Sequence, residues 1–396
     1  MLRAAGIKVL KTGDEEGFSG LRQKWNSLLS VAAAGNVFLS WQWLWSWWNA
    51  YKDASFSLCI LLVFRGDDLI GIGPFYIKKQ AVAPGLAVRR LLFLGTVEND
   101  AISEYMDFIY ASAEAETVAA ALLKFILKER LCDDMSFQKI GMDSPALPLI
   151  RKITRQSSGG AGPLFILREV YESPYLELPD KGILPGSGGG GDLLMNVLSA
   201  PLRAKIMRNR KKLARYADVF FRRTTDTAQL RPDFGELVRL HQLRWEARNL
   251  GGSFSDARFL GFHRAVMPVL LENGYLDLWL LRVAGKCIGA LYNISYAGKV
   301  FYYQSGIDTS FNRGLAPGYL LHSHCMEDAI GRGMRQYDFL AMGALDSYKK
   351  QWTSTAGRMC DVYLAVSGMM KLFMGAKERA KAVIARKTPA LGKTPE

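Results

Sequence analysis

The chain has 396 residues, of which 49% are apolar and 22% are charged, and it carries a formal net charge of +14. This length and composition exclude a disordered or fibrous protein and favour a globular protein with two domains. The positive charge is concentrated in two segments of the chain. Residues 203–223 hold nine basic residues and one acid, and residues 371–396 hold seven basic residues and two acids. We therefore expect one or two anion-facing surfaces.

The first predicted helix spans residues 38–51, with Ser40 as its N-cap and tryptophans at helical spacing. Two strands, 58–64 and 69–77, follow around a Gly-containing turn, and a third strand is predicted at 90–94. A helix is expected over 114–128. Gly- and Ser-rich stretches at 156–162 and 185–191 interrupt the pattern, and the second predicts a flexible linker.

The second half begins with a predicted basic helix over 193–216 and a further helix over 234–249. Strands at 275–283, 287–296 and 300–305 are joined by tight Ala-Gly-Lys turns, which predicts an antiparallel meander. A Gly- and Pro-containing loop at 306–317 leads into a helix that ends near residue 331, and a strand follows at 336–341. Segments 62–71 and 281–289 share one pattern of strand, Gly turn and strand, which indicates a duplicated α/β unit.

The junction between the 300–305 strand and the next helix has the features of an anion site. Pro317 and Gly318 lie in the first turn of that helix, where proline is tolerated and backbone N–H groups are free to bind a pyrophosphate. Arg313 in the preceding loop adds a donor for a charge-assisted bond to phosphate. An ordinary loop and helix start is the alternative interpretation.

Several motifs in the second half resemble those of a known family. They are Tyr302-Tyr303, the loop Arg313-Gly-Leu-Ala-Pro-Gly318, Tyr337-Asp338-Phe339, and Tyr348-Lys349-x-x-Trp352. Together they resemble the CelD-BcsL acetyltransferases, which are related to the FemABX peptidoglycan aminoacyltransferases and are built on GNAT domains. The resemblance covers about residues 193–366, and the aromatic helix with Ser103-Glu-Tyr-Met-Asp107 is similar to the N-terminal half of the same proteins.

The resemblance implies an α/β (α+β) fold of tandem GNAT-like domains, each a mixed, mainly antiparallel sheet flanked by helices. Combined with the linker, it predicts four segments. Residues 1–180 form an acceptor-recognising domain, 181–191 the linker, 192–370 the acyltransferase domain, and 371–396 a basic tail.

The same resemblance implies roles for individual residues. Acetyl-CoA or another acyl-CoA is the expected donor, and no metal is expected. Its binding residues are Tyr303, Ser305, Gly306 and Ile307 on an exposed strand edge, and Arg313, Gly314, Pro317 and Gly318 at the phosphate loop. A backbone N–H at the strand edge would stabilise the oxyanion. Asp338 is the first candidate for the base and Asp308 the second. Tyr348 would protonate the leaving thiolate, and Lys349 would bind a phosphate or an anionic acceptor.

Acceptor binding is expected from both halves. His241, Arg244 and Trp245 lie at i, i+3 and i+4 on one helical face. Glu104, Tyr105 and Trp352 complete the predicted set. The family implies an acceptor amine or hydroxyl on a sugar or a lipid-linked precursor of the cell envelope or an exopolysaccharide. Ordinary structural roles stay open for Asp338, for the Tyr348-Lys349 pair and for Arg244.

Two alternatives concern the donor and the basic helix. The usual GNAT phosphate loop has no proline at its fifth place, where this chain has Pro317, and FemABX relatives use aminoacyl-tRNA, so an aminoacyl-tRNA donor is the second hypothesis. Seven basic residues between 203 and 215 also suit a non-catalytic nucleic-acid-binding module, or a solvated helix face. No nucleic acid other than tRNA is an expected partner.

Other features argue against further chemistries and bear on location. In His322-Ser-His-Cys325, residues two apart on a helix point about 200° apart, which opposes a zinc site. Five widely spaced cysteines predict free thiols in a reducing cytoplasm. We find no signal-peptide pattern and no run of about 18 apolar residues. The basic tail suits an amphipathic helix, so peripheral association with the inner membrane stays open.

Overall fold

The computed structural model describes residues 6–84, 86–97, 102–156, 162–180, 190–246, 249–343 and 346–387. Residues 181–189 of the predicted linker, most of the Gly-rich stretch at 156–162 and the end of the basic tail lie outside the described residues. None of the helices within these ranges is long and apolar enough to cross a membrane.

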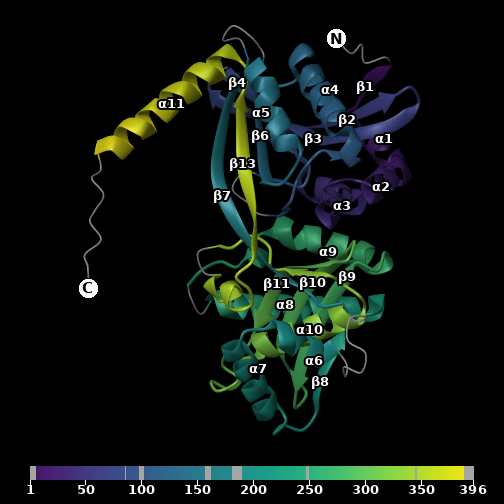
Figure 1. The fold of residues 1–396 in the computed structure, drawn as a ribbon, viewed down its shortest axis with the longest axis vertical. Helices are drawn as coiled ribbons and strands as arrows, with labels where there is room; N and C mark the ends of the chain where they lie inside the picture. Colours follow the sequence, from purple (N-terminus) through teal and green to yellow (C-terminus); the bar gives the residue numbers. More distant parts are fainter. Residues whose placement is uncertain are drawn as a thin grey trace.

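The first half contributes the upper part of the molecule in Figure 1. Its elements are β1 (Ile7–Thr12), α1 (Glu15–Gly20), α2 (Arg22–Ser30), α3 (Trp41–Tyr51), β2 (Phe56–Arg65), β3 (Asp68–Ala83), β4 (Leu86–Phe93), β5 (Ile109–Tyr110), α4 (Ala115–Lys128), β6 (Asp134–Gly141), α5 (Ala146–Gln156) and β7 (Leu164–Glu177).

The second half forms the lower part of the same view, except for its last strand and its last helix, which lie in the upper part. Its elements are α6 (Gly190–Val197), α7 (Ala200–Leu213), β8 (Val219–Arg223), α8 (Thr227–Glu246), α9 (Ala257–Glu272), β9 (Leu276–Val283), β10 (Lys286–Tyr296), β11 (Lys299–Ile307), α10 (Pro317–Gly331), β12 (Gln336–Asp338), the short 3₁₀ helix η4 (Ser347–Gln351), β13 (Ala356–Ala365) and α11 (Gly368–Lys387).

The strands pair in the order β1-β2-β3-β4-β6-β13-β7-β12-β11-β10-β9-β8, and β5 pairs with β3. Among the described pairs, β4–β6 and β11–β12 are parallel and the others antiparallel. Helices lie against both parts of the sheet. This arrangement confirms the predicted class of a mixed, mainly antiparallel sheet flanked by helices.

Two long strands connect the upper and lower parts of the sheet (Figure 1). Strand β7 pairs with β13 from Leu164 to Pro174 and with β12 from Tyr175 to Glu177. Strand β13 belongs to the second half in sequence, yet it pairs with β6 and β7 of the first half. The two halves therefore share backbone hydrogen bonds as well as side-chain contacts.

The antiparallel meander is confirmed as β9, β10 and β11. The predicted aromatic helix is α3, and the Ser40 hydroxyl accepts a hydrogen bond from the Trp43 N–H at 3.3 Å. Both segments of the suspected duplication form antiparallel hairpins, β2–β3 and β9–β10.

Two predicted elements were wrong. The single helix over 193–216 is two helices, because Ser199 caps a new helix whose first turn contains Pro201. The strand at 336–341 ends at Asp338, and Leu340 two residues later adopts a left-handed φ of 58°, which turns the chain out of the extended conformation.

Aromatic side chains join the two halves close to the sheet. The Trp43 ring of α3 lies 4.9 Å from that of Phe262 in α9 and 5.5 Å from that of Tyr303 in β11, centroid to centroid. Helix α8 packs directly on β11 at Gly306, where an added Cβ would lie 2.6 Å from the Leu240 Cβ and the His241 nitrogen. This close approach places the His241 face of α8 beside β11.

Candidate functional site

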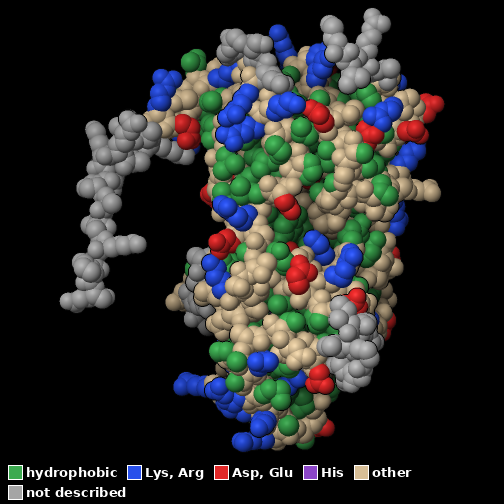
Figure 2. Space-filling view, viewed as in Figure 1, with side chains coloured by type: hydrophobic (Ala, Val, Ile, Leu, Met, Phe, Trp, Pro, Cys, Tyr) green, Lys and Arg blue, Asp and Glu red, His purple; other side chains and the backbone are tan. Residues whose placement is uncertain are grey.

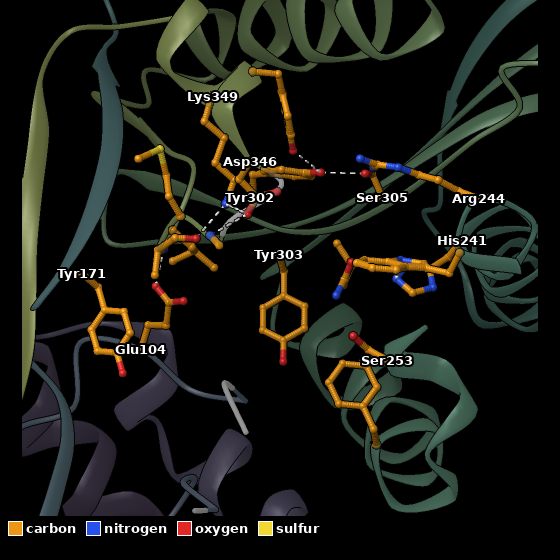
Figure 3. A pocket seen from close by; sticks show the side chains of 18 of the residues that line it. Glu104, Tyr171, His241, Arg244, Ser253, Tyr302, Tyr303, Ser305, Asp346 and Lys349 are labelled. Atoms are coloured by element: carbon orange, nitrogen blue, oxygen red, sulfur yellow. Dashed lines mark hydrogen bonds and ion pairs between the residues drawn. The ribbon is translucent and has the colours of Figure 1, made fainter. Parts of the chain in front are cut away.

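A cavity of about 530 Å³ lies between the two halves, and we call it the interdomain cavity. The first half supplies Glu104, Lys139 and Tyr171 to its wall, and the second half supplies side chains from α8, β11 and the segment after β12. Figure 3 shows Glu104 and Lys349 on one side of this space and Arg244 and His241 on the other, with Tyr303 between them. Its lining is therefore built jointly by both halves.

A smaller cavity of about 230 Å³ lies at the start of α10, and we call it the α10 cavity. Gly318 and Tyr319 of the first helical turn line it, together with Ile307 and Trp352. Four side chains line both cavities: Arg244, Tyr302, Ser305 and Tyr348. The two spaces therefore meet at one polar boundary.

Strand β11 presents an unpaired edge near this boundary. Its parallel pairing with β12 covers only Lys299 to Phe301, whereas β11 continues to Ile307. The pairing of β11 with β10 shifts between Tyr302 and Gln304, which leaves Tyr303 as the extra residue of a β-bulge. Bulges of this kind re-aim backbone and side-chain groups next to active sites.

A chain of hydroxyl groups crosses the boundary. The Tyr348 hydroxyl donates to the Tyr302 hydroxyl at 3.0 Å, and the Tyr302 and Ser305 oxygens are 2.6 Å apart. Burial raises the pKa of Tyr348 above its usual value, with a further contribution from Tyr302. Tyr348 therefore keeps its proton at neutral pH.

Glu104 is the buried carboxyl group of the interdomain cavity. Its Oε2 accepts a hydrogen bond from the Ala341 N–H at 2.7 Å. Burial raises the pKa of Glu104, and the charges of Lys139 and Lys349 oppose that shift only in part. A carboxyl group with a raised pKa at the wall of a cavity suits a general base.

Two lysines lie on the same side of the cavity. Lys349 donates from Nζ to the Ala341 carbonyl at 2.9 Å and forms an ion pair with Asp346 at 3.2 Å. Burial lowers the pKa of Lys139, against the attraction of Glu104 and Asp361. With Arg244 opposite, the cavity favours an anionic or strongly polar ligand.

Backbone strain gathers around this cavity. Tyr105, Lys139 and Leu340 have φ values of 53°, 57° and 58°. Lys139 and Leu340 line the cavity, and Tyr105 follows Glu104. Non-glycine residues in this region cost free energy and persist only where the surroundings hold them.

Asp338 supplies part of that support. It accepts hydrogen bonds from the Tyr105 hydroxyl and the Leu340 N–H, both at 2.7 Å, and from the Ser173 hydroxyl at 3.0 Å. Burial raises the pKa of Asp338, and the bonds from Tyr105, Leu340 and Ser173 oppose that rise. Its carboxylate braces two strained residues and is absent from the lining of the interdomain cavity.

Most of the residues predicted from sequence come together at the two cavities. The interdomain cavity is lined by Tyr303, Ser305, His241, Arg244, Trp245, Glu104, Tyr348 and Lys349, and the α10 cavity by Ile307, Gly318 and Trp352, with Ser305, Arg244 and Tyr348 shared.

The His241–Trp245 pair lies along α8. The Trp245 indole N–H donates to His241 Nε2 at 3.0 Å. Burial lowers the pKa of His241 to about 4, so its ring is neutral near pH 7. Arg244 on the same helix is half-buried and lines both cavities.

Other predicted residues lie apart from both linings. Asp308 accepts bonds from the Ser310 N–H and hydroxyl at 2.9 and 2.6 Å and from Lys286 Nζ at 3.0 Å, so it shapes the loop before α10. Burial would raise the pKa of Asp308, but its bonds to Ser310 and Lys286 outweigh burial and lower it. Arg313 is exposed.

The remaining predicted residues have structural positions. The Gly314 carbonyl accepts a bond from Lys212 Nζ at 2.6 Å. Pro317 is the buried first residue of α10, Gly306 faces α8, and the Tyr105 side chain points to Asp338.

Sequence reasoning missed several lining residues, among them Lys139, Tyr171 and Asp346. Lys139 lies on β6, a strand that the periodicity did not predict, and its backbone there has a positive φ. Asp346 is two residues before Tyr348, so the Tyr-Lys motif could have suggested it. No group of three or more His, Cys, Asp or Glu suited to a metal occurs within the described ranges.

Comparisons with known proteins bear on this geometry. Residues 200–350 match the family model of the acetyltransferase (GNAT) domain. No curated protein matched the sequence. Among solved structures, FemX superposes with a TM-score of 0.57 and 14% identity, covering 86% of this chain and 95% of that chain.

Two further structures are similar in fold. A conserved protein of unknown function from Bacteroides thetaiotaomicron has a TM-score of 0.52 and 12% identity, covering 90% of this chain and all of its own. The C-terminal domain of a putative lysylphosphatidylglycerol synthetase from Agrobacterium fabrum has a TM-score of 0.51 and 9% identity, with coverages of 90% and 95%. The chain thus has a segment, residues 200–350, that matches the acetyltransferase (GNAT) domain, and its fold is similar to these structures along nearly their whole length.

Proposed function

We propose that this chain transfers an acyl group from acyl-CoA, held at the α10 cavity, to an amine or hydroxyl in the interdomain cavity. One observation carries the proposal. The two cavities meet at Tyr302, Ser305 and Tyr348, beside the bulged and unpaired edge of β11. A transferase needs its two substrates to meet at a group that can stabilise the new negative charge.

The donor side is suited to phosphate. Helix α10 has 15 residues, and no side chain caps its first turn. Its N–H groups and dipole therefore favour a pyrophosphate. Two lysines of α7 lie close by, because Lys212 reaches Gly314 at 2.6 Å and Lys205 Nζ lies 4.0 Å from the centre of the Tyr319 ring.

The reaction follows from the positions of the side chains. Glu104 takes a proton from the acceptor, whose nitrogen or oxygen then attacks the thioester carbonyl. A backbone N–H of the free β11 edge stabilises the tetrahedral oxyanion. As the carbon–sulfur bond breaks, Tyr348 gives its proton to the leaving thiolate. Tyr348 then regains a proton from solvent through Tyr302 and Ser305, and Glu104 releases the acceptor's proton to solvent. Asp338, the first sequence candidate, acts here as a positioning residue.

The acceptor is proposed to be a sugar or lipid-linked precursor of the cell envelope or an exopolysaccharide, as the CelD-BcsL resemblance implies. The cationic side chains of Lys139, Arg244 and Lys349 support an acceptor that carries a phosphate or carboxylate. We also propose a cytoplasmic location with contact to the membrane surface. The exposed Leu372 and Phe373 on the basic helix α11 support that contact.

An aminoacyl-tRNA donor is the second candidate. It is favoured by the basic face of α7 beside the α10 loop, where blue side chains gather at the lower end of the molecule in Figure 2. The similarity to FemX and to the putative lysylphosphatidylglycerol synthetase is compatible with this donor. Binding that tracks many phosphates weakens steeply as salt rises, whereas binding of a single CoA changes far less.

Calorimetric titration with acetyl-CoA and longer acyl-CoAs tests the donor site. In Gly318→Asp the new carboxylate would repel phosphate, while an acid in the first turn favours the helix dipole. An added Cβ at Gly318 has its nearest neighbour, Ile307 Cδ1, at 4.0 Å, so the fold should accept it. Gly318→Asn is the matched neutral control.

We expect micromolar binding that falls about tenfold or more in the Asp variant and much less in the Asn variant, since one ionic contact to phosphate is worth about 1.5–3 kcal/mol. Failure of every acyl-CoA to bind, together with salt-sensitive binding of aminoacyl-tRNA, would replace the first candidate by the second.

A further inference from the structure

A third cavity, of about 650 Å³, lies between α8 and α9 and is distinct from the two described above. Leu230, Phe234 and Val238 of α8 and Met267 of α9 give it an apolar wall. Its volume falls within the range of small-molecule binding sites, and such sites combine an apolar lining with a few polar groups. We call it the α8–α9 cavity.

A polar side chain without a partner lines this cavity. His263 is fully buried, and neither of its ring nitrogens has a hydrogen-bond partner among the described residues. Burying such groups unpaired costs free energy, so they are rare in folded proteins.

Two arginines lie at the exposed rim of the same cavity. Arg231 comes from α8 and Arg264 from α9. Neither forms an ion pair or a hydrogen bond within the described part of the chain, whereas Arg239, two turns along α8 from Arg231, pairs with Glu236 at 2.8 Å. Unpaired guanidinium groups from two facing helices can bind one carboxylate or phosphate between them.

We infer that the α8–α9 cavity binds an anionic lipid-like amphiphile, with its alkyl chain along the apolar wall and its phosphate head between Arg231 and Arg264. This inference does not depend on acyl transfer. The His263 ring lies 4.4 Å from that of Phe259 and 5.0 Å from that of Tyr303, centroid to centroid, and both rings line the interdomain cavity. The rings of Phe259 and Tyr303 would therefore separate the bound amphiphile from the proposed acceptor.

The test uses the full-length protein and dodecyl phosphate, below its micelle concentration, in a calorimetric titration. We expect saturable binding of one molecule per chain, no binding of inorganic phosphate at the same concentrations, and weak binding of neutral dodecyl maltoside. The double variant Arg231→Gln/Arg264→Gln should lose about tenfold or more in affinity, because two charge-assisted bonds are removed.

Two further variants make the result specific. Arg208→Gln/Arg215→Gln removes the same charge from two exposed positions, one on α7 and one just after it, and should bind as wild type. Val238→Trp narrows the cavity from a half-buried position and should abolish binding while the circular dichroism spectrum is kept. Equal affinity in the two double variants, or full binding by Val238→Trp, would overturn the site.

The α8–α9 cavity could instead hold the acyl chain of an acyl-CoA donor. Titration with dodecanoyl-CoA separates the two, because its affinity should fall in Gly318→Asp and stay unchanged in Arg231→Gln/Arg264→Gln. If the arginine pair instead weakened dodecanoyl-CoA and left dodecyl phosphate unaffected, the cavity would belong to the donor and the lipid assignment would be wrong.

Discussion

Replacing Glu104 by Gln removes the proposed base and changes little else. The Gln carboxamide has nearly the same shape, and its oxygen can still accept the Ala341 N–H that lies 2.7 Å from the carboxylate. A positioned base contributes about a hundredfold to ten-thousandfold to a rate, which is about 3–5 kcal/mol of barrier. We expect kcat/KM for the acceptor to fall by that factor, with donor affinity within about twofold of wild type because Glu104 is remote from the α10 cavity.

The pH dependence has a defined sign. Since burial raises the pKa of Glu104, the wild-type rate should rise with pH and level off above a midpoint that exceeds the usual Glu value of about 4.3. Glu104 stays protonated to a higher pH in the folded protein than in the unfolded chain. The stability of the protein therefore falls as pH rises from the unfolded pKa through the folded pKa. Gln does not ionise, so the Glu104→Gln variant does not lose stability in this way. It should therefore melt at a higher temperature than wild type at neutral pH.

The assay follows thiol release from acyl-CoA between pH 5 and 9, with thermal melts of the same samples. Glu172→Gln is the control, because Glu172 is exposed on β7 and pairs with Lys350 at 2.7 Å. It should leave both the rate and the pH profile unchanged. A Glu104→Gln enzyme that kept about a third or more of wild-type activity would refute the assignment of the base.

Three further changes test separate parts of the site. Tyr348→Phe should lower kcat about tenfold to a hundredfold by removing the acid for the thiolate, with donor affinity unchanged in calorimetry; an unchanged kcat would contradict that role. Asp338→Asn should lower kcat through Tyr105 and Leu340 yet keep the midpoint of the pH–rate profile, and a lost pH dependence would instead make Asp338 the base. Gly306→Ala should cost about 1–3 kcal/mol of stability in a denaturant melt, since its Cβ would meet α8 at 2.6 Å, whereas Gly318→Ala should cost little.

The parts of the fold that sequence predicts are those fixed by short-range pattern. Tight Ala-Gly-Lys turns identify the β9–β11 meander, because Ala284 and Ala297 adopt positive φ beside their glycines. The aromatic helix and the start of α10 also follow from local signals, Ser40 and Pro317. Among the predicted residues that line the two cavities, Tyr303, Ser305, Ile307 and Gly318 belong to these segments.

The rest depends on pairing between distant residues. Strand β13 reaches β6 and β7 across about half the chain, for example with Tyr363 opposite Ser136, and no local pattern encodes such a partner. Lys139 lies on β6, which pairs with β13, so the sequence alone could not place its side chain at the interdomain cavity. Asp338 was placed on the correct strand, but its role depends on Tyr105, which lies far away in the chain.

A crystal structure of the protein with acetyl-CoA tests the central claim most directly. It should show the pyrophosphate at the first turn of α10 near Gly318, and the thioester carbonyl against the β11 edge next to Tyr303, with Glu104 facing it across the interdomain cavity. Pyrophosphate bound elsewhere, with both cavities empty of the cofactor, would contradict the proposed arrangement of donor and acceptor.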